Sequence, residues 1–360
     1  MRGVSGKTDC DVLVLGLGPA GSSAAAAVAK AGLSVIGVDK KAEAGVPVQC
    51  AEFVPSLIGQ ETGDISGSRL QFINDMVTYV GNHDADHVPG FRGNMISRAK
   101  FDRQLVEKAV GAGADCRFGT AVRAIDEDGR VTFSDGSTLK GRILIGADGP
   151  HSKAGKSIGC ENTECVESRQ ITVQLLKPHD GTDIFLSADI PGGYGWLFPK
   201  GGEANVGLGV APQFKHLLKP LLESLHVRLV SEGRVGTDAS CFTGGAIPVG
   251  GLVKPFGRLV DCPVLLCGDA AGLTNPVTGA GISSAAMSGG LAGRAASDLL
   301  VGKPNTAENY EEELDDLFGP SIRRALRHRR RLMDTYAAGA KPDESMLKAT
   351  WIAYPEYWAA

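Results

Sequence analysis

The chain has 360 residues, of which 43% are hydrophobic and 22% charged, and its net charge is −4. This composition is typical of a globular protein with a full core, and the mild negative charge gives no reason to expect nucleic acid. The eight cysteines are too dispersed for a small disulfide-bonded secreted domain, and no His cluster accompanies them to suggest a metal site. No apolar segment is long enough to span a bilayer or resembles a signal peptide, so we expect a cytoplasmic protein.

The first predicted unit is a strand, a helix and a second strand. Residues 11–15 form an apolar run typical of a buried strand, and a Gly-rich turn, an Ala-rich helix and the strand "SVIGV" follow. In such a turn the first glycine makes the bend, the second admits a pyrophosphate, and the third lets the helix pack on the strand. The helix N-terminus attracts phosphate, and an acid after the second strand accepts a ribose hydroxyl. The predicted cofactor residues here are Gly16, Gly18, Pro19, Ala20, Gly21, Asp39 and Lys40.

Cys50 follows in the turn-rich segment "EAGVPVQCAEF". A cysteine in such a chain is usually a small buried hydrophobe, and the alternative is a thiol directed at a substrate.

The middle of the chain alternates between strands and one clear helix. The helix starts at Ser97 and has an apolar face at Phe101, Leu105 and Ala109. Residues 76–80, 171–176 and 183–190 are typical of strands. These strands predict an antiparallel sheet inserted into the dinucleotide-binding fold.

Tyr194, Trp196 and Phe198 alternate, so they point to one face of a strand. The returning strand places Gly207 and Gly209 on one face, where they leave room for a flat or bulky group. An aromatic row opposite a glycine gap suits a flavin edge and an apolar substrate, although an ordinary sheet core has the same appearance.

Two later segments favour FAD over NAD. Residues 142–145 and 264–267 are predicted strands that run into "GADG" and "GDAAG", and an NAD-dependent dehydrogenase needs neither. Asp269 can accept hydrogen bonds from the ribityl hydroxyls of FAD, and the "NPVTGAGI" turn can present backbone N–H groups to the flavin. The predicted cofactor residues in these segments are Asp148, Gly149, Gly268, Asp269, Pro276, Gly279, Gly281 and Ile282.

These three motifs, in this order over residues 9–296, resemble the fingerprint of the p-hydroxybenzoate-hydroxylase-like flavoproteins. "PVQC" and "GGYGWLFPKGGEANVGLGV" are similar to segments of the geranylgeranyl reductase family within that class. The resemblance implies an FAD enzyme that reduces isolated C=C bonds of polyprenyl chains with electrons from NAD(P)H or a small redox protein. It places Arg98 beside FAD and makes Cys50, Tyr194 and Trp196 the candidate catalytic residues, with Cys50, or less readily Tyr194 or Glu52, as the proton source.

The chain departs from that family in two places. Archaeal members read closer to C-G-E-G at the cysteine, whereas Ala51 and Phe53 stand here in place of two glycines. The C-terminus is also shorter than in the polyprenyl-lipid reductases. We therefore expect less space beside the thiol and a more open site, suited to a smaller or carrier-bound apolar substrate.

No second G-x-G-x-x-G motif has its own strand–helix–strand unit, so NAD(P)H would bind transiently near the flavin, or a redox protein would supply the electrons. Near the C-terminus a charged helical stretch carries an arginine cluster. It predicts a peripheral membrane contact, a docking face for an acidic electron-transfer protein, or a solvated face paired with "EEELDD". The cluster is Arg323, Arg324, Arg327, Arg329, Arg330 and Arg331.

The predicted fold class is α/β: a GR2-type FAD-binding Rossmann-like fold with an inserted antiparallel β-sheet substrate domain and a C-terminal helical segment. The FAD-binding part covers residues 1–66, 97–165 and 255–305, the substrate part 67–96 and 166–254, and the helical segment 306–360. The leading hypothesis is an FAD-dependent C=C reductase. The alternatives are an NAD(P)H-oxidising flavoprotein that feeds a protein or carrier-bound cofactor, and an FAD-dependent aromatic hydroxylase.

Overall fold

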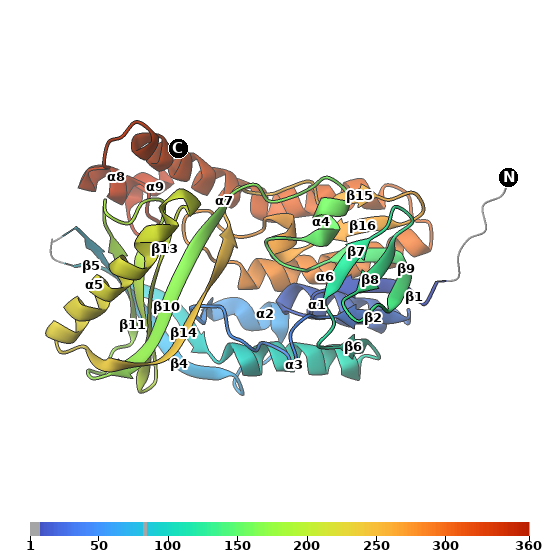
Figure 1. Ribbon diagram of the computed structural model, residues 1–360, viewed down its shortest axis with the longest axis horizontal. Coiled ribbons are helices and arrows are strands. Elements are labelled where there is room, and N and C mark those ends of the chain that lie inside the picture. The colour runs from blue at the N-terminus through green and yellow to red at the C-terminus, as the bar shows by residue number, and fades with distance from the viewer. Residues whose placement is uncertain (1–7, 82–84, 360) are drawn as a thin grey trace.

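The computed structural model describes residues 8–81 and 85–359, which form two β-sheets surrounded by helices (Figure 1). The start of the predicted segment 1–66, residues 82–84 of the segment 67–96, and Ala360 lie outside the described residues. The first sheet has the order β15-β16-β9-β1-β2-β6, and β7 and β8 form a hairpin beside β9. Its strands are β1 (Cys10–Leu15), β2 (Val35–Val38), β6 (Asp115–Arg117), β7 (Val122–Ile125), β8 (Arg130–Phe133), β9 (Thr138–Gly146), β15 (Phe256–Arg258) and β16 (Pro263–Leu266).

The centre of the first sheet is parallel: β1 pairs with β2 and β9, and β9 pairs with β16. Parallel strands are covered on both faces, which explains why β1 reads as an almost uninterrupted apolar run. The chain turns after β1 at Gly16, whose φ is +92° and whose added Cβ would lie 2.3 Å from the Ala147 carbonyl oxygen. Only glycine tolerates both conditions, so the predicted role of Gly16 in the bend is confirmed.

Helices α1 (Pro19–Lys30), α3 (Arg98–Gly111), α4 (Lys153–Ser157) and α6 (Ile282–Leu300) accompany this sheet (Figure 1). The predicted helix after Ser97 is confirmed as α3: the Ser97 hydroxyl accepts the Lys100 N–H at 3.4 Å, and Phe101 is buried. Helices α1 and α6 approach closely because a Cβ on Gly289 would lie 2.0 Å from the Ala20 carbonyl oxygen. This contact brings the N-terminal halves of two helices to one edge of the sheet.

The second sheet has the order β14-β10-β13-β12-β11-β4-β5-β3. Most neighbours are antiparallel, as predicted, but β4 and β11 are parallel. A tight hairpin can join only antiparallel strands, so β4 and β11 need a long connection. The chain provides it: after β5 it forms β6 to β9, which belong to the first sheet, and then returns to the second sheet with β10. The strands are β3 (Phe53–Pro55), β4 (Arg69–Val80), β5 (Asp86–Ile96), β10 (Cys165–Leu175), β11 (Gly181–Leu186), β12 (Gly195–Lys200), β13 (Glu203–Val210) and β14 (Val235–Pro248).

The remaining helices cover the second sheet and join it to the first. Helix α5 (Leu218–Ser231) packs on β10, β13 and β14, and the long α7 (Thr306–Ala337) runs along one side of the whole molecule (Figure 1). Helices α8 (Glu344–Ala349) and α9 (Pro355–Trp358) fold back beside the second sheet, and α2 (Gly59–Thr62) lies between the sheets. Within residues 8–81 and 85–359, no helix is both long and apolar enough to cross a membrane. The predicted α/β fold is confirmed.

Candidate active site

The loops that follow β1, β2, β9 and β16 meet at one edge of the first sheet, where ligands bind in open α/β sheets. Helix α1 begins there at Gly18 without a side-chain cap, and an added Cβ on Gly18 would have open space around it. The Asp39 carboxylate lies beside this turn and accepts the N–H groups of Leu17 and Lys41, both at 2.8 Å. Lys40 is exposed next to it. Free helix amides, open space and a nearby carboxylate suit a dinucleotide phosphate and ribose.

Asp269 forms the second half of the candidate cofactor site. Its carboxylate accepts the Thr274 hydroxyl at 3.0 Å, and burial raises the pKa of Asp269, which Thr274 and Arg98 partly counteract. A Cβ on Gly281 would lie 3.3 Å from this carboxylate, so glycine keeps it accessible. Helix α6 starts at the next residue, Ile282, without a side-chain cap. A buried acid beside free helix amides fits a flavin with its ribityl chain, since both donors and an acceptor are present.

The carboxylate of the predicted cofactor residue Asp148 accepts its hydrogen bonds from neighbouring residues of the protein. Its carboxylate accepts the Ser152 hydroxyl at 2.5 Å and the Lys153 N–H at 2.7 Å, so it stabilises the start of α4. Burial raises the pKa of Asp148. Asn162 donates to the carbonyl oxygens of Pro150 and Asp269, which ties the loop after β9 to the loop after β16. Asp148 and Gly149 therefore shape this edge, and a direct contact of Asp148 with FAD stays a prediction.

The segment around Cys50 is held against the second sheet by hydrogen bonds from β10, β14 and, through the Asn205 amide that donates to the Ala51 carbonyl oxygen, β13. The Gln170 amide donates to the Cys50 carbonyl oxygen at 3.2 Å, and the Thr243 hydroxyl donates to that of Val48 at 2.6 Å. The Glu52 N–H donates to the Cys50 sulfur at 3.2 Å. Cys50 is half-buried, so its thiol is neither sealed in the core nor freely exposed.

Arg98 lies next to Cys50 at the start of α3. Its guanidinium donates to the Asp102 carboxylate at 3.0 and 3.1 Å. Burial alone would lower the pKa of Arg98, but Asp102 and Cys50 raise it by more, so the group remains charged. The charge of Arg98 also acts on Asp269. Arg98 therefore connects the cysteine segment with Asp269, and its place beside FAD stays a prediction.

Tyr194, Trp196 and Phe198 form the predicted aromatic row, with centroids 5.8 and 6.3 Å apart between successive rings. The Tyr194 hydroxyl donates to the Thr278 carbonyl oxygen at 2.6 Å, which joins the row to the loop before α6. Burial raises the pKa of Tyr194, so the phenol keeps its proton. The Trp196 indole donates to the Gln170 side chain at 3.0 Å, and Gln170 in turn holds Cys50.

Neighbouring side chains, and not a ligand, fill the space beside Gly207 and Gly209. A Cβ on Gly207 would lie 2.4 Å from the Trp196 ring, and a Cβ on Gly209 would lie 2.8 Å from a Val166 methyl group. The flat group that fills the gap at Gly207 is thus the indole of the neighbouring strand. The prediction that these glycines admit a flavin edge or a substrate is wrong.

The C-terminal helices close one side of the aromatic row. Trp351 is 3% exposed and packs on Tyr194 with centroids 4.8 Å apart. A cavity of about 30 Å³ remains here, and the residues that line it are Leu186, Gly192, Gly193, Tyr194, Pro276, Val277, Arg329, Leu332, Leu347, Thr350 and Trp351. At the other end of the row, Phe53 stacks on Phe91 at 5.7 Å and lies 6.0 Å from Phe198. The site is more enclosed on the Trp351 side than the short C-terminus suggested.

The arginine cluster on α7 does not form one surface. Arg323 pairs with Asp315 of the "EEELDD" stretch at 2.5 Å, which agrees with the solvated, paired helix face. Arg324 lies over the Trp358 ring at 5.1 Å. Arg329 is only 7% exposed, donates to the Gly192 carbonyl oxygen at 2.7 Å, and has its pKa lowered by burial. Its assignment to a surface cluster is wrong, because it points inward under the turn that leads to Tyr194.

The sequence motifs missed most of the residues that position Cys50. The Glu52 carboxylate accepts the Arg98 N–H at 3.0 Å, the Asn205 amide at 3.1 Å and the Lys200 ammonium group at 2.8 Å. The acid two residues after the cysteine was a visible signal, and its partner Arg98 on α3 was already a candidate through the family resemblance. No local pattern marks the other two partners, Lys200 on β12 and Asn205 on β13.

Comparison with known proteins agrees with this geometry. A family model described as geranylgeranyl reductase catalytic domain matches residues 162–229, and a model described as lycopene cyclase protein matches residues 11–179. Digeranylgeranylglycerophospholipid reductase 2 of Methanopyrus kandleri is 35% identical over 343 residues, with 88% of this chain and 85% of the relative covered. The corresponding reductase of Methanocella arvoryzae is 32% identical over 346 residues, with the same coverage of each chain.

Solved structures give the same result. A geranylgeranyl bacteriochlorophyll reductase-like protein from Thermoplasma acidophilum has a TM-score of 0.81, with 25% identity and 97% of each chain covered. A probable FAD-dependent monooxygenase from Pseudomonas aeruginosa has a TM-score of 0.69 at 18% identity, with 92% of this chain and 98% of that chain covered, which supports the fold alone. The chain belongs to the geranylgeranyl reductase family of FAD-dependent C=C reductases.

Proposed function

We propose that this enzyme reduces C=C bonds in the isoprenoid chains of a lipid, and that NAD(P)H or a small redox protein supplies the electrons. The observation that carries the proposal is the Tyr194–Thr278 hydrogen bond of 2.6 Å. It joins an apolar aromatic wall to the loop that is expected to face the flavin. The names of the curated relatives, digeranylgeranylglycerophospholipid reductases, support a lipid of this class.

The residues at the site suggest how the chain contributes. When bound, and once NAD(P)H or a redox protein has reduced it, FAD would supply the hydride that one carbon of the double bond needs. The other carbon needs a proton, and the Cys50 sulfur is our candidate donor. After this transfer the C=C bond has become a C–C single bond with one new hydrogen on each carbon, and Cys50 is left as a thiolate. The charged Arg98 beside it stabilises that thiolate until water returns the proton.

The aromatic residues have a different role in this proposal. Burial raises the pKa of Tyr194, so its hydroxyl keeps the proton that it donates to Thr278 and fixes the loop. Trp196 and Phe198 are each 7% exposed and wall off water from the reacting bond. Tyr194 is thus a positioning residue here, and Trp196 holds Cys50 through Gln170.

An anaerobic reaction with chemically reduced enzyme tests the reaction without the natural electron donor. Dithionite-reduced enzyme receives a digeranylgeranyl lipid or its fully saturated analogue, and the product is followed by mass spectrometry. We expect the unsaturated lipid alone to reoxidise the flavin and to gain one pair of hydrogens for each double bond reduced. Flavin that is reoxidised only by oxygen, with unchanged lipid, would refute the proposal. NADH, NADPH and a reduced ferredoxin, offered separately to oxidised enzyme, then identify the donor by the rate of flavin bleaching.

A further inference from the structure

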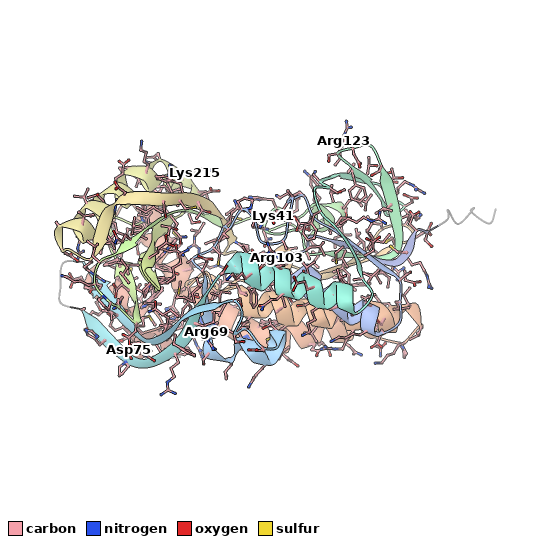
Figure 2. All side chains as sticks on the ribbon, turned by 90° about the horizontal axis from the view of Figure 1, so that it is seen from below. Lys41, Arg69, Asp75, Arg103, Arg123 and Lys215 are labelled. Carbon is pink, nitrogen blue, oxygen red and sulfur yellow. The ribbon has the colours of Figure 1, made fainter. Side chains whose placement is uncertain are left out.

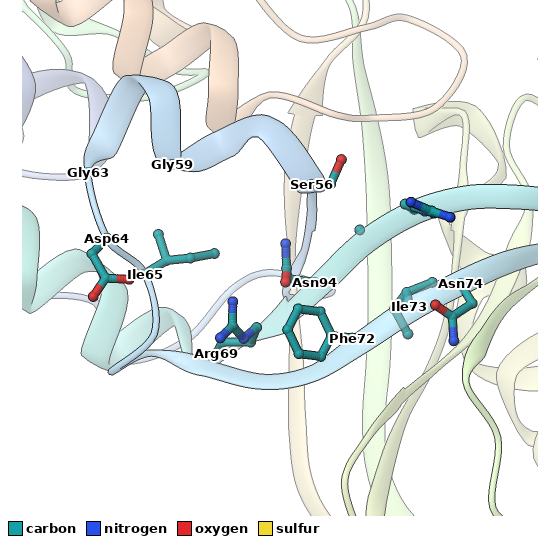
Figure 3. Close-up of a pocket in the computed structure, with 12 residues that line it drawn as sticks. Ser56, Gly59, Gly63, Asp64, Ile65, Arg69, Phe72, Ile73, Asn74 and Asn94 are labelled. Atoms are coloured by element: carbon teal, nitrogen blue, oxygen red, sulfur yellow. The ribbon is translucent and has the colours of Figure 1, made fainter.

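A second pocket lies away from the aromatic row, between α2 and the β4–β5 hairpin. Its volume is about 510 Å³, which is in the range of small-molecule sites. Figure 3 shows Arg69, Phe72 and Asn94 on the strands that face α2 and Gly63. The residues that line it are Ser56, Gly59, Gly63, Asp64, Ile65, Arg69, Phe72, Ile73, Asn74, Arg92, Gly93 and Asn94.

This pocket is separate from the candidate active site because side chains alternate along β5. Phe91 and Met95 belong to the cluster that contains Tyr194, Trp196 and Phe198. Arg92 and Asn94 stand between them in the sequence and point to the opposite face of the strand. Ile73 of β4 lines the pocket and also belongs to that cluster, so the β4–β5 hairpin lies between a ligand in this pocket and the aromatic row.

Two arginines give the pocket its charge. Within residues 8–81 and 85–359, neither Arg69 nor Arg92 forms an ion pair, and Arg69 lies over the Phe72 ring at 4.2 Å. Among the described residues that line the pocket, Asp64 is the only acid. Its carboxylate accepts hydrogen bonds from the N–H and the hydroxyl of Ser66. Guanidinium groups bind phosphate oxygens well because they offer several N–H donors in one plane.

Asn94 adds a different requirement. It is 4% exposed, it lines the pocket, and its side-chain oxygen has no hydrogen-bond partner among the described residues. A buried acceptor without a partner is unfavourable, so a donor on a ligand would stabilise it. The ligand should therefore carry an anionic group for the arginines and a hydroxyl or ammonium group for Asn94. A phosphate ester with a polar head has both.

The rim of the pocket indicates where this phosphate ester comes from. Phe72, which lines the pocket, is 60% exposed, and Leu57 and Leu70, which follow the lining residues Ser56 and Arg69 in the sequence, are 65% and 44% exposed. Exposed apolar side chains next to basic residues are typical of surfaces that lie at a membrane interface. A soluble phosphate ester would leave them in water, whereas the acyl region of a lipid would cover them.

We propose that this pocket binds the phosphate-bearing headgroup of an anionic membrane phospholipid, with Leu57, Leu70 and Phe72 inserted at the interface. The lipid is a membrane component and not the substrate, so the proposal does not depend on which double bond is reduced. The pocket would hold the enzyme at the surface of the bilayer in which lipids of this kind reside.

Co-sedimentation of the FAD-loaded enzyme with vesicles tests the pocket. The vesicles contain phosphatidylcholine alone or phosphatidylcholine mixed with phosphatidylglycerol, and Arg69→Gln/Arg92→Gln is the test variant. Binding to the anionic vesicles should weaken about fivefold for each arginine, and about 25-fold for the pair. Arg123→Gln/Arg258→Gln is the matched control because it removes the same charge from exposed positions outside the pocket, and Figure 2 shows Arg69 and Arg123 far apart. Equal weakening by both pairs would show that only net charge matters and would overturn the proposal.

Phe72→Trp gives a second readout that does not need the arginine variants to fold. The emission of the new tryptophan is obtained as the difference between the spectra of the variant and the wild type. It should shift to shorter wavelength with anionic vesicles, and a bromolipid in the vesicles should quench it. Glycerol 3-phosphate and NADPH are the soluble probes. A fluorescence change with either soluble probe but not with vesicles would assign the pocket to a soluble phosphate ester, and no change with any of them would show that the pocket binds none of these groups. Either result overturns the proposal and leaves the anaerobic reductase reaction unaffected.

Discussion

Glu52 and Lys200 form an ion pair of 2.8 Å at the base of the cysteine segment, with side chains 6% and 15% exposed. The backbone of Glu52 has φ +69°, a left-handed conformation that is uncommon for residues other than glycine. Such a conformation persists only where the surroundings over-determine it, and the bonds of the Glu52 carboxylate to Arg98, Lys200 and Asn205 supply that constraint. The ion pair thus fixes the backbone on which Cys50 is presented.

Replacing Glu52 with Gln should destabilise the protein and misplace Cys50. Removal of one partner from a largely buried pair leaves the other charge uncompensated, which costs about 3 kcal/mol. Urea unfolding of Glu52→Gln should show this loss. The double variant Glu52→Gln/Lys200→Met should recover most of it, because no unpaired ammonium group remains. Lys200→Met alone completes the comparison. If the stability losses of Glu52→Gln and Lys200→Met simply add up in the double variant, the two side chains are not coupled.

Cys50→Ser should retain FAD and lose most of the reductive turnover. A positioned proton donor contributes about 10²–10⁴-fold to a rate, and a serine hydroxyl is a far weaker acid than a thiol. Single-turnover rates of flavin reoxidation by the lipid provide the measurement, and the flavin absorbance spectrum reports occupancy. Cys241→Ser is the control, since Cys241 is an exposed thiol on β14. A Cys50→Ser enzyme that turns over at the wild-type rate would remove the thiol from the mechanism.

Asp269→Asn should separate stability from FAD binding. Burial raises the pKa of Asp269, so ionised Asp269 disfavours the folded apoprotein, and this penalty grows as pH rises through its folded-state pKa. The Asn apoprotein should therefore be more stable than wild type at neutral pH, and the two should converge at acid pH where Asp269 is protonated. FAD affinity should fall about tenfold to a hundredfold, because hydrogen bonds to a charged acceptor are lost. Thermal unfolding against pH and flavin fluorescence titrations measure both effects. A lower apoprotein stability at neutral pH, or unchanged FAD affinity, would contradict them.

The first strand–helix–strand unit was predictable because its determinants are local. The turn at Gly16 needs a left-handed residue within a few positions of the strand and helix it joins, and the sequence displays all of these together. The aromatic alternation of Tyr194, Trp196 and Phe198 was predictable for the same reason, since strand periodicity alone places the three rings on one face.

Contacts between distant segments were not predictable in this way. Periodicity showed that Gly207 leaves a gap, but it could not show that the indole of Trp196 on the adjacent strand fills it. Arg329 reads as one more charge in a basic helix, and its inward position follows from how α7 packs near Gly192. The parallel pairing of β4 and β11 depends on a return of the chain after a whole intervening unit.

Trp351 offers the sharpest test of whether the C-terminal helices form part of the substrate site. Its indole N–H has no partner among the described residues, although the ring is 3% exposed and packs on Tyr194. Trp351→Phe removes the unpaired N–H and keeps an aromatic ring, so we expect stability equal to or above that of wild type. Trp351→Ala leaves a cavity and should cost about 3–5 kcal/mol.

The two variants should also differ in catalysis. Trp351→Ala opens the wall opposite Tyr194, so KM for the lipid should rise several-fold while the anaerobic reduction of the flavin by dithionite stays unchanged. Trp351→Phe should keep a KM near that of wild type because the ring contact remains. Steady-state assays with lipids of different chain length, run on both variants, make the comparison. Equal KM values for Trp351→Ala and wild type at every chain length would place the C-terminal helices outside the substrate site.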